Sequence, residues 1–339
     1  MFAVTVQTPG SPATLAWTEV PDPVPGRGEV LIDVIAGGVN RADLLQAAGH
    51  YPPPPGASPI LGMECSGVVS GLGPGVYGWQ IGDRVCALLA GGGYAERVAV
   101  PAVQVLPIPE GIDPVAAAGL PEATCTVWSN LVMTAGLKSR QTVLIHGGSS
   151  GIGTMAIQVA RQEGATVAVT ASRPQALEFC RTLGAAITIN YAEQDFVQEI
   201  RDATGGRGAD IILDVIGAKY LERNIDALAD GGRLIVIGMQ GGTTGQLNLN
   251  SLLRKRAGII GTTLRSRPVT GPGSKAEVVA SVQEGLWPQI RNGEIKPVID
   301  AVIDMENAGE AHRRLATGGH IGKIVLRTPK ATENRGVDR

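Results

Sequence analysis

Residues 142–163 constrain the fold more than any other part of the chain. An apolar run rich in β-branched residues, 142–146, enters a turn of glycines and serines at 147–153, and apolar residues at helical spacing follow. A strand, a tight glycine turn and a helix in this order open the βαβ unit that binds dinucleotides. The N–H groups and the dipole at a helix N-terminus attract phosphate, and glycines allow it to approach closely.

The turn departs from the strict GxGxxG pattern at one position. Gly148 and Gly153 fit the pattern, but Ser150 stands at its middle position and Gly151 follows. A serine hydroxyl can still donate a hydrogen bond to phosphate. The alternative is a glycine-rich turn without a ligand. The flanking strand and helix, and the repeating pattern downstream, favour a diphosphate site.

Composition restricts the class of protein. At 339 residues, with 44% hydrophobic and 18% charged residues, the chain is long enough for two domains with a sizeable core. A net charge of -2 gives no electrostatic footprint for nucleic acid or an anionic membrane. The four scattered cysteines predict buried thiols rather than disulfides. Without a secretory signal or a membrane-length apolar run, we expect a cytoplasmic protein.

The first part of the chain, residues 1–122, predicts an antiparallel, barrel-like domain. Its short strand-like runs are separated by proline and glycine, without helices between most of them. These runs are 2–6, 29–36, 67–71, 83–89 and 94–100. We expect a short helix over 40–46, and the proline run 52–55 predicts a stiff loop.

Residues 123–266 predict a doubly wound parallel sheet, because strand and helix patterns alternate. The expected strands are 143–146, 166–170, 187–190, 210–214, 233–238 and 258–263. The expected helices are 123–135, 151–163, 174–183, 196–203, 220–229 and, more weakly, 249–254. In 267–330, helix 277–293, strand 298–303, helix 306–317 and strand 323–327 are expected to return and complete the first domain. The tail 331–339 predicts disorder.

The end of the second parallel strand indicates which nicotinamide cofactor the chain binds. An acidic residue there would bind the ribose 2′-hydroxyl of NAD, but the chain has Ser172 and Arg173. A carboxylate would repel a 2′-phosphate, whereas a guanidinium pairs with it. Alternatively, the two residues form a solvated helix start with Ser172 as N-cap. Because capping and phosphate binding are compatible, we predict NADPH.

The residues do not predict a metal site. A Gly-His-Glu ligand motif would need histidine at Met63, and Asn40 stands where a cysteine ligand would be expected. Thioether and amide groups are poor zinc ligands beside thiolate and imidazole. The four histidines show no ligand spacing; they are His50, His146, His312 and His320.

Three residues are candidates for the reacting end of the site. Tyr51 precedes the stiff proline loop, which could present its hydroxyl as an acid; packing of its ring on the barrel is the alternative. Asn40 could touch a ribose hydroxyl or a substrate oxygen, or cap the following helix. Thr126 could reach the nicotinamide, or face the core. His146, beside the phosphate turn, is interpreted as structural.

Several motifs together resemble the zinc-independent medium-chain dehydrogenase/reductases of the quinone oxidoreductase branch. They are the segments 40–43, 62–67, 91–96, 120–123, 146–153 and 321–325. Within this branch, Tyr51 with its proline run and the segment 264–267 are most similar to the p53-inducible quinone oxidoreductase group. The resemblance extends from Met1 to about Arg327.

The resemblance implies a GroES-like catalytic domain, residues 1–122 completed by 267–330, and a Rossmann NADP-binding domain, residues 123–266. It further implies NADPH-dependent reduction of a quinone in the interdomain cleft by a homodimer or homotetramer that associates through the last Rossmann strand. Many relatives have a lysine shortly after the second strand; here Arg173 must supply that charge alone.

The resemblance also assigns residues to the parts of the cofactor. The pyrophosphate would lie on Ser149, Ser150, Gly151 and Ile152. The adenosine 2′-phosphate would lie among Ser172, Arg173 and Tyr191. The nicotinamide side would be flanked by Gly238, Met239 and Leu264, with Lys323 near the cleft. Asn40, Tyr51 and Thr126 would line the reacting end.

Two other functions stay open at this point. One is an NADPH-dependent reductase of α,β-unsaturated carbonyls, such as alkenals or enoyl thioesters, which needs a donor to protonate the α-carbon. The other is a protein that binds NADPH without significant turnover. The sequence leaves undecided the physiological acceptor, the choice of dimer or tetramer, and whether electrons move singly or as hydride.

Overall fold

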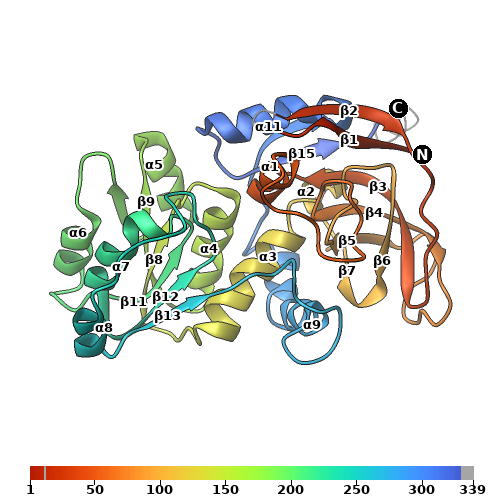
Figure 1. Ribbon diagram of the computed structural model, residues 1–339. Coiled ribbons are helices and arrows are strands. Elements are labelled where there is room, and N and C mark those ends of the chain that lie inside the picture. Colours follow the sequence, from red (N-terminus) through yellow and green to blue (C-terminus); the bar gives the residue numbers. More distant parts are fainter. Residues whose placement is uncertain (11–12, 330–339) are drawn as a thin grey trace. The chain divides into compact units, whose positions relative to one another are not determined.

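The computed structural model describes residues 1–10 and 13–329. The chain divides into two compact units (Figure 1). The barrel unit contains Met1–Cys125 and the chain from Leu264 onward, and the Rossmann unit contains Thr126–Thr263. The division therefore falls after Cys125 and Thr263, against expected boundaries after 122 and 266.

The barrel unit is built on one mixed sheet in the order β14-β15-β3-β4-β5-β7, with β6 paired to β3. The C-terminal strand β15 pairs antiparallel with β3, so the end of the chain completes this sheet. The strands are β1 (Phe2–Thr8), β2 (Thr14–Glu19), β3 (Glu29–Gly38), β4 (Glu64–Leu72), β5 (Arg84–Leu88), β6 (Arg97–Pro101), β7 (Val105–Pro107), β14 (Ile299–Asp304) and β15 (Lys323–Arg327).

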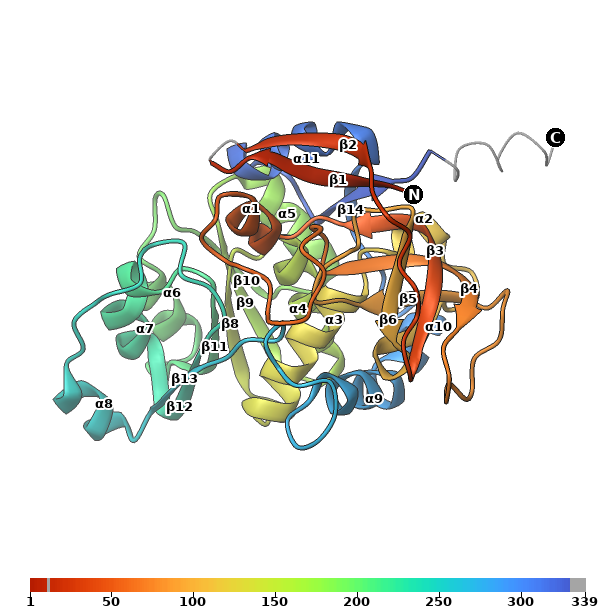
Figure 2. The same cartoon turned by 45° about the vertical axis from the view of Figure 1, so that its right-hand side comes forward.

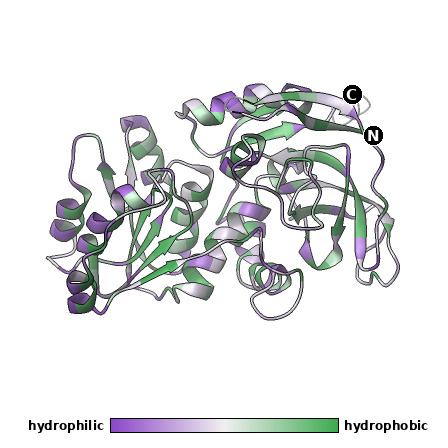
Figure 3. Cartoon of the chain, viewed as in Figure 1, coloured by the Kyte–Doolittle hydropathy of each residue, from purple (hydrophilic) through white to green (hydrophobic). Residues whose placement is uncertain are grey.

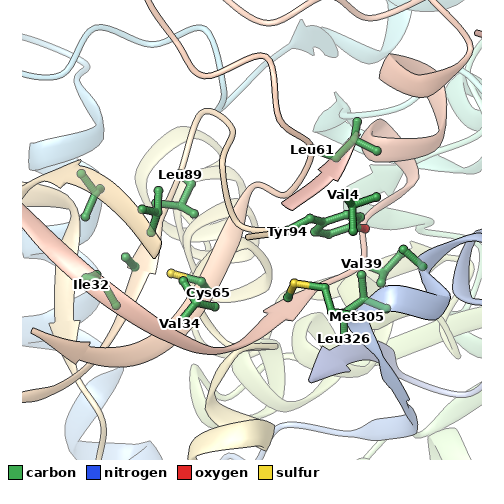
Figure 4. Packing of buried hydrophobic residues seen from close by; sticks show 14 of the residues in the cluster. Val4, Ile32, Val34, Val39, Leu61, Cys65, Leu89, Tyr94, Met305 and Leu326 are labelled. Atoms are coloured by element: carbon green, nitrogen blue, oxygen red, sulfur yellow. The ribbon is translucent and has the colours of Figure 1, made fainter. Parts of the chain in front are cut away.

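Short helices connect and cover these strands. They are α1 (Arg41–Ala47), η1 (Ala102–Gln104), α2 (Pro114–Ala117), α9 (Lys275–Gly285), α10 (Trp287–Arg291), η4 (Met305–Asn307) and α11 (Ala308–Thr317). Strands β1 and β2 form a separate antiparallel pair beside α11 (Figure 2). Alternate residues of β3 and β4 point inward to a core that includes Ile32, Val34, Cys65 and Tyr94 (Figure 4). Burial of this apolar surface stabilises the unit.

The Rossmann unit is a six-stranded, all-parallel sheet in the order β10-β9-β8-β11-β12-β13. Its strands are β8 (Thr142–His146), β9 (Thr166–Ala171), β10 (Ile187–Asn190), β11 (Ala209–Asp214), β12 (Leu228–Val236) and β13 (Gly258–Gly261). The helices that follow β8 in this unit are α4 (Gly151–Gln162), α5 (Pro174–Leu183), α6 (Phe196–Ala203), η3 (Ala218–Tyr220), α7 (Leu221–Ala227) and α8 (Leu249–Lys255). The strand order reverses between β8 and β11, the point at which such sheets bind dinucleotides.

Hydropathy follows this layering. In the Rossmann unit the strands are strongly hydrophobic, while the surrounding helices carry their hydrophilic residues outward (Figure 3). Helix α5, for example, buries Ala176, Leu177 and Cys180 and exposes Arg181 and Glu178. Within the described residues, no helix is long and apolar enough to cross a membrane.

The predicted helix 123–135 is wrong in its second half. Helix α3 (Pro121–Trp128) is followed by a π-helical segment, η2 (Ser129–Thr134). There, Asn130 Nδ2 donates to the Thr126 carbonyl at 2.7 Å, and Thr262 Oγ1 donates to Asn130 Oδ1 at 2.6 Å. The side chain of Asn130 thus engages the backbone locally, which apolar periodicity does not reveal.

Other elements differ at their boundaries. Helix α7 ends at Ala227 and β12 begins at Leu228, where we expected helix to 229 and strand from 233. The expected helix 277–293 is two helices, because Pro288 can occupy only the first turn of α10. Strands β2 and β7 were not predicted. The tail 331–339 lies outside the described residues.

Candidate functional site

The candidate phosphate turn, residues 147–150, joins β8 to α4, and contact geometry requires its glycines. Gly147 has φ +72, a conformation that disfavours a side chain. A Cβ on Gly148 would lie 2.6 Å from Val169 Cβ, and a Cβ on Gly153 would lie 2.3 Å from the Gly147 carbonyl oxygen. The turn can therefore close against β9 and α4 only without these side chains.

Ser150 begins helix α4 as its N-cap. Its Oγ accepts a hydrogen bond from the Gly153 N–H at 3.0 Å, so its own proton remains to be donated. The next N–H groups, of Gly151 and Ile152, belong to the first turn, where an α-helix supplies no acceptor. Free N–H groups, a hydroxyl proton and missing Cβ atoms fit a diphosphate.

A neutral, buried network supports this turn from below. His146 Nε2 lies 2.7 Å from Asn224 Oδ1, and Nδ1 lies 3.0 Å from Thr170 Oγ1. Thr170 Oγ1 in turn accepts the Gly147 N–H at 3.4 Å. Burial lowers the pKa of His146 to about 4, so the ring is neutral at pH 7. His146 therefore has the structural surroundings that the sequence suggested.

The residues expected at the adenosine end follow β9 and β10. Arg173, which is half-buried, occupies the N-cap position of α5, whereas Ser172 is exposed and one residue earlier. The alternative in which Ser172 caps this helix is therefore wrong. Asn190 and Ala171, the last residues of β10 and β9, pair with each other. Tyr191 therefore follows β10 at the same carboxyl edge of the sheet, and its exposed fraction is 46%.

The remaining expected cofactor residues are dispersed. Gly238 and Met239 follow β12, and Met239 is 57% exposed. Because β8, β9, β10 and β12 are parallel, their carboxyl ends share one edge with the phosphate turn. Thr126 is buried within α3, and Leu264, at 7% exposure, belongs to the barrel unit.

In the barrel unit, Lys323 is the centre of a buried polar network. Its Nζ donates to Asn40 Oδ1 at 2.6 Å and to the Val39 carbonyl at 3.1 Å, and pairs with Glu64 Oε1 at 2.6 Å. Asn40 Nδ2 donates to the same Glu64 oxygen at 2.9 Å, and the Glu122 N–H donates to the other at 2.9 Å. Three acceptors thus match the three donors of the ammonium group.

Asp43 extends this network and was not singled out from the sequence. It is fully buried, and its carboxylate accepts the N–H groups of Asn40 and Gly62 and the hydroxyl of Tyr94. Burial raises its pKa to about 6. The signal was available, because Asn40 and Asp43 have the spacing of a capping box at the start of α1.

The donor chemistry of this region does not fit a metal. Both oxygens of the Glu64 carboxylate are occupied, by an ammonium group and two N–H donors. Met63 is buried and offers only a thioether, which is a poor zinc ligand. Across residues 1–10 and 13–329, no three His, Cys, Asp or Glu side chains gather as a metal site. All four cysteines are buried free thiols.

Comparison with known proteins identifies the family. Residues 26–110 match the alcohol dehydrogenase GroES-like domain, and residues 151–282 match the zinc-binding dehydrogenase family. The chain is 31% identical over 334 residues to a 2-haloacrylate reductase of Burkholderia sp, covering 96% of this chain and 98% of that protein. It is 31% identical over 329 residues to a quinone oxidoreductase of Rattus norvegicus, covering 96% and 97%. This chain belongs to the medium-chain dehydrogenase/reductase family.

Solved structures agree with this assignment. The Escherichia coli quinone oxidoreductase complexed with NADPH matches with a TM-score of 0.86 at 27% identity, over 96% of this chain and all of that one (100%). The CurK enoyl reductase matches with a TM-score of 0.85 at 28% identity, over 97% and 99%. The chain is therefore an oxidoreductase of the quinone oxidoreductase and enoyl reductase type that uses a nicotinamide cofactor.

The chain also resembles part of much larger proteins. It is 32% identical over 336 residues to a mycocerosic acid synthase-like polyketide synthase of Mycobacterium tuberculosis, but it spans only 15% of that protein's length.

Proposed function

We propose that this protein is an NADPH-dependent quinone oxidoreductase. The observation that carries the proposal is the carboxyl edge of the Rossmann sheet, where the turn before α4 has the geometry to accept a diphosphate and where Arg173, rather than an acid, follows β9. A guanidinium attracts the 2′-phosphate of NADPH, whereas NADH offers it only a hydroxyl.

The residues of the turn would hold the cofactor by its diphosphate. Gly151 and Ile152 would donate their N–H groups, and Ser150 its hydroxyl proton, while Arg173 would bind the 2′-phosphate. Reduced nicotinamide supplies the hydride, so the protein's task is orientation and stabilisation of charge. A quinone becomes an oxyanion that water can protonate, which explains why an obligatory acid is not required.

Tyr51 is proposed to contact the acceptor oxygen, and Asn40 is proposed to line the same end of the site. Tyr51 is half-buried at the start of the irregular proline loop, and the amide of Asn40 is fixed by Lys323 and Glu64. A phenol hydrogen bond stabilises a developing oxyanion. Tyr51→Phe is expected to slow turnover roughly tenfold. A loss of several thousandfold would instead make Tyr51 an obligatory acid.

The second candidate is reduction of an α,β-unsaturated carbonyl compound, which the 2-haloacrylate reductase and the CurK enoyl reductase among the relatives favour. Rates of NADPH oxidation with 1,4-benzoquinone, 1,2-naphthoquinone and an alkenal separate the two, and NADH replaces NADPH in a parallel series. Faster turnover of the alkenal would favour this candidate. Binding of NADPH without oxidation by any acceptor would indicate a binding protein.

We also propose a dimer through β13. This strand lies at the edge of the parallel sheet, and α8 leaves Leu249 and Leu253 63% and 74% exposed. An open edge with neighbouring apolar side chains favours pairing with a second copy. Light scattering of wild type and Ile260→Asp tests this proposal, because the variant should shift the mass to that of a monomer.

A further inference from the structure

Arg265 is a buried cation without a carboxylate partner. It is 3% exposed, and it follows the last strand of the Rossmann unit by only a few residues. Within residues 1–10 and 13–329, no carboxylate oxygen lies within 4 Å of its guanidinium. Burying a charge without a counter-charge is costly, so the hydrogen bonds of the Arg265 guanidinium must offset much of this cost.

Those bonds are directed at one loop of the barrel unit. Arg265 Nη1 donates to the carbonyl of Tyr51, at a distance of 3.4 Å, where the loop begins. Its Nη2 donates to Gln46 Oε1 at 2.6 Å, and Gln46 Nε2 donates to the Pro59 carbonyl at 2.9 Å, where the loop ends. Arg265 and Gln46 therefore hold residues 51–59 at both ends. Arg265 Nε also donates to the Ala90 carbonyl at 2.8 Å.

The guanidinium also contacts the side chain of Tyr51. Its central carbon lies 5.3 Å from the centroid of the phenol ring, within the range of a cation–π interaction. The four consecutive prolines of this loop have no N–H groups, so they cannot donate to a hydrogen-bond ladder. The fork of Arg265 adds a constraint at the start of the loop from a position 214 residues away in the chain.

We propose that Arg265 is the positioning residue of Tyr51: it fixes the loop that presents the phenol and places a cation against its ring. The cation–π contact and the hydrogen bond to the Tyr51 carbonyl hold the phenol in place while it donates to the reduced acceptor. Arg265 thereby acts through Tyr51 rather than through the cofactor. This inference rests on the proposed role of Tyr51 in acceptor reduction.

The first test does not require turnover. Hydrogen–deuterium exchange of the peptide covering 51–60 is compared in wild type, Arg265→Met and the matched control Arg267→Met, whose arginine is two residues away and reaches the Gly273 carbonyl instead. Exchange should rise severalfold in Arg265→Met and stay unchanged in Arg267→Met. Equal exchange in wild type and Arg265→Met would overturn the inference.

The second test is a double-mutant cycle with Tyr51→Phe, read as kcat at saturating acceptor. Arg265→Met should lower kcat by about tenfold with an unchanged Kd for NADPH, and the double variant should be no slower than Tyr51→Phe. Additive losses, or a weakened affinity for NADPH, would overturn the inference. Arg265→Lys, which retains the charge but not the fork, should recover only part of the rate.

If Arg265→Met does not fold, Gln46→Met takes its place in both experiments, since it breaks the clamp at Pro59 and leaves the arginine in place. If none of the tested acceptors supports NADPH oxidation by the wild type, the proposed function fails. The exchange experiment still decides whether Arg265 holds the loop.

Discussion

The candidate sites of the two units consist of different chemical groups. The Rossmann unit uses backbone N–H groups and missing Cβ atoms, supported by the neutral network of His146, Thr170 and Asn224. The barrel unit uses a buried ion pair, Lys323 with Glu64, whose remaining donors and acceptors are matched inside the protein. A backbone site tolerates most side-chain changes except at glycine, whereas a buried charged site depends on every partner.

The largest expected effect follows from removing the buried cation. Lys323→Met leaves the fully buried Glu64 carboxylate without its counter-charge, which should lower the free energy of unfolding by about 3–5 kcal/mol. Denaturant unfolding of the barrel unit measures this loss. The matched control is Arg327→Met on the same strand, because its pair with Asp304 is partly exposed and should cost less than about 1 kcal/mol.

A companion variant separates lost charge pairing from lost packing. In Lys323→Met with Glu64→Gln, the uncompensated carboxylate is gone, so part of the stability should return. Equal costs for Lys323→Met and Arg327→Met would contradict the contrast between the two units, since the buried network would then behave like a surface ion pair.

The neutral network of the Rossmann unit should appear in the pH dependence of stability. The pKa of His146 is about 4 in the folded protein against its usual 6.5, so the unfolded chain binds a proton that the folded protein does not. The neutral imidazole therefore contributes about 3 kcal/mol to the free energy of unfolding. This contribution is complete above pH 6.5 and is lost as the pH falls through 4. His146→Gln should remove this dependence.

The comparison must be made between wild type and variant because another group acts in the opposite direction. Burial raises the pKa of Asp214, in the same unit, to about 6, so its contribution is lost as the pH rises from 3.8 through 6. Chemical denaturation between pH 4 and 7 gives both curves. Parallel curves for wild type and His146→Gln would mean that the imidazole binds its proton in the folded state.

The backbone site should be sensitive at glycine. In Gly153→Ala the new Cβ would meet the Gly147 carbonyl oxygen at 2.3 Å, so the turn must open, at a cost of about 1–3 kcal/mol in NADPH binding. The expected weakening, by roughly tenfold or more, is measured by fluorescence titration. Gly309→Ala in α11 is the control, because the atom nearest to its Cβ position is the flexible end of the Arg313 side chain, 3.5 Å away. If NADPH binds both variants equally well, the turn does not hold the diphosphate.

The difference between a backbone site and a side-chain network also explains which features the sequence could predict. The candidate phosphate turn and the parallel sheet are local or periodic features, so spacing along the chain was sufficient to predict β8 and α4 and the position of Arg173 between β9 and α5. The cofactor role of Arg173 stays a prediction. The network of Lys323 joins residues 283 positions apart, and no local pattern indicates which ammonium meets which carboxylate. The clamp by Arg265 was missed for the same reason. The π-helical turn at Asn130 was missed because apolar periodicity says nothing of a side chain that bonds the preceding backbone.

Arg173 is the charged side chain in the otherwise backbone-built site, so it gives the smallest and most selective effect. Arg173→Gln removes one charge-assisted contact to the 2′-phosphate, so the Kd for NADPH should rise about tenfold, or about 1.4 kcal/mol, while the Kd for NADH stays the same. Arg181→Gln, an exposed arginine in the same helix that pairs with Glu178, is the control for net charge and should change neither value. If Arg173→Gln weakened both cofactors equally, its guanidinium would act on the shared diphosphate. The Rossmann site would then depend on a side-chain charge as the barrel unit does, and the contrast between the units would be lost.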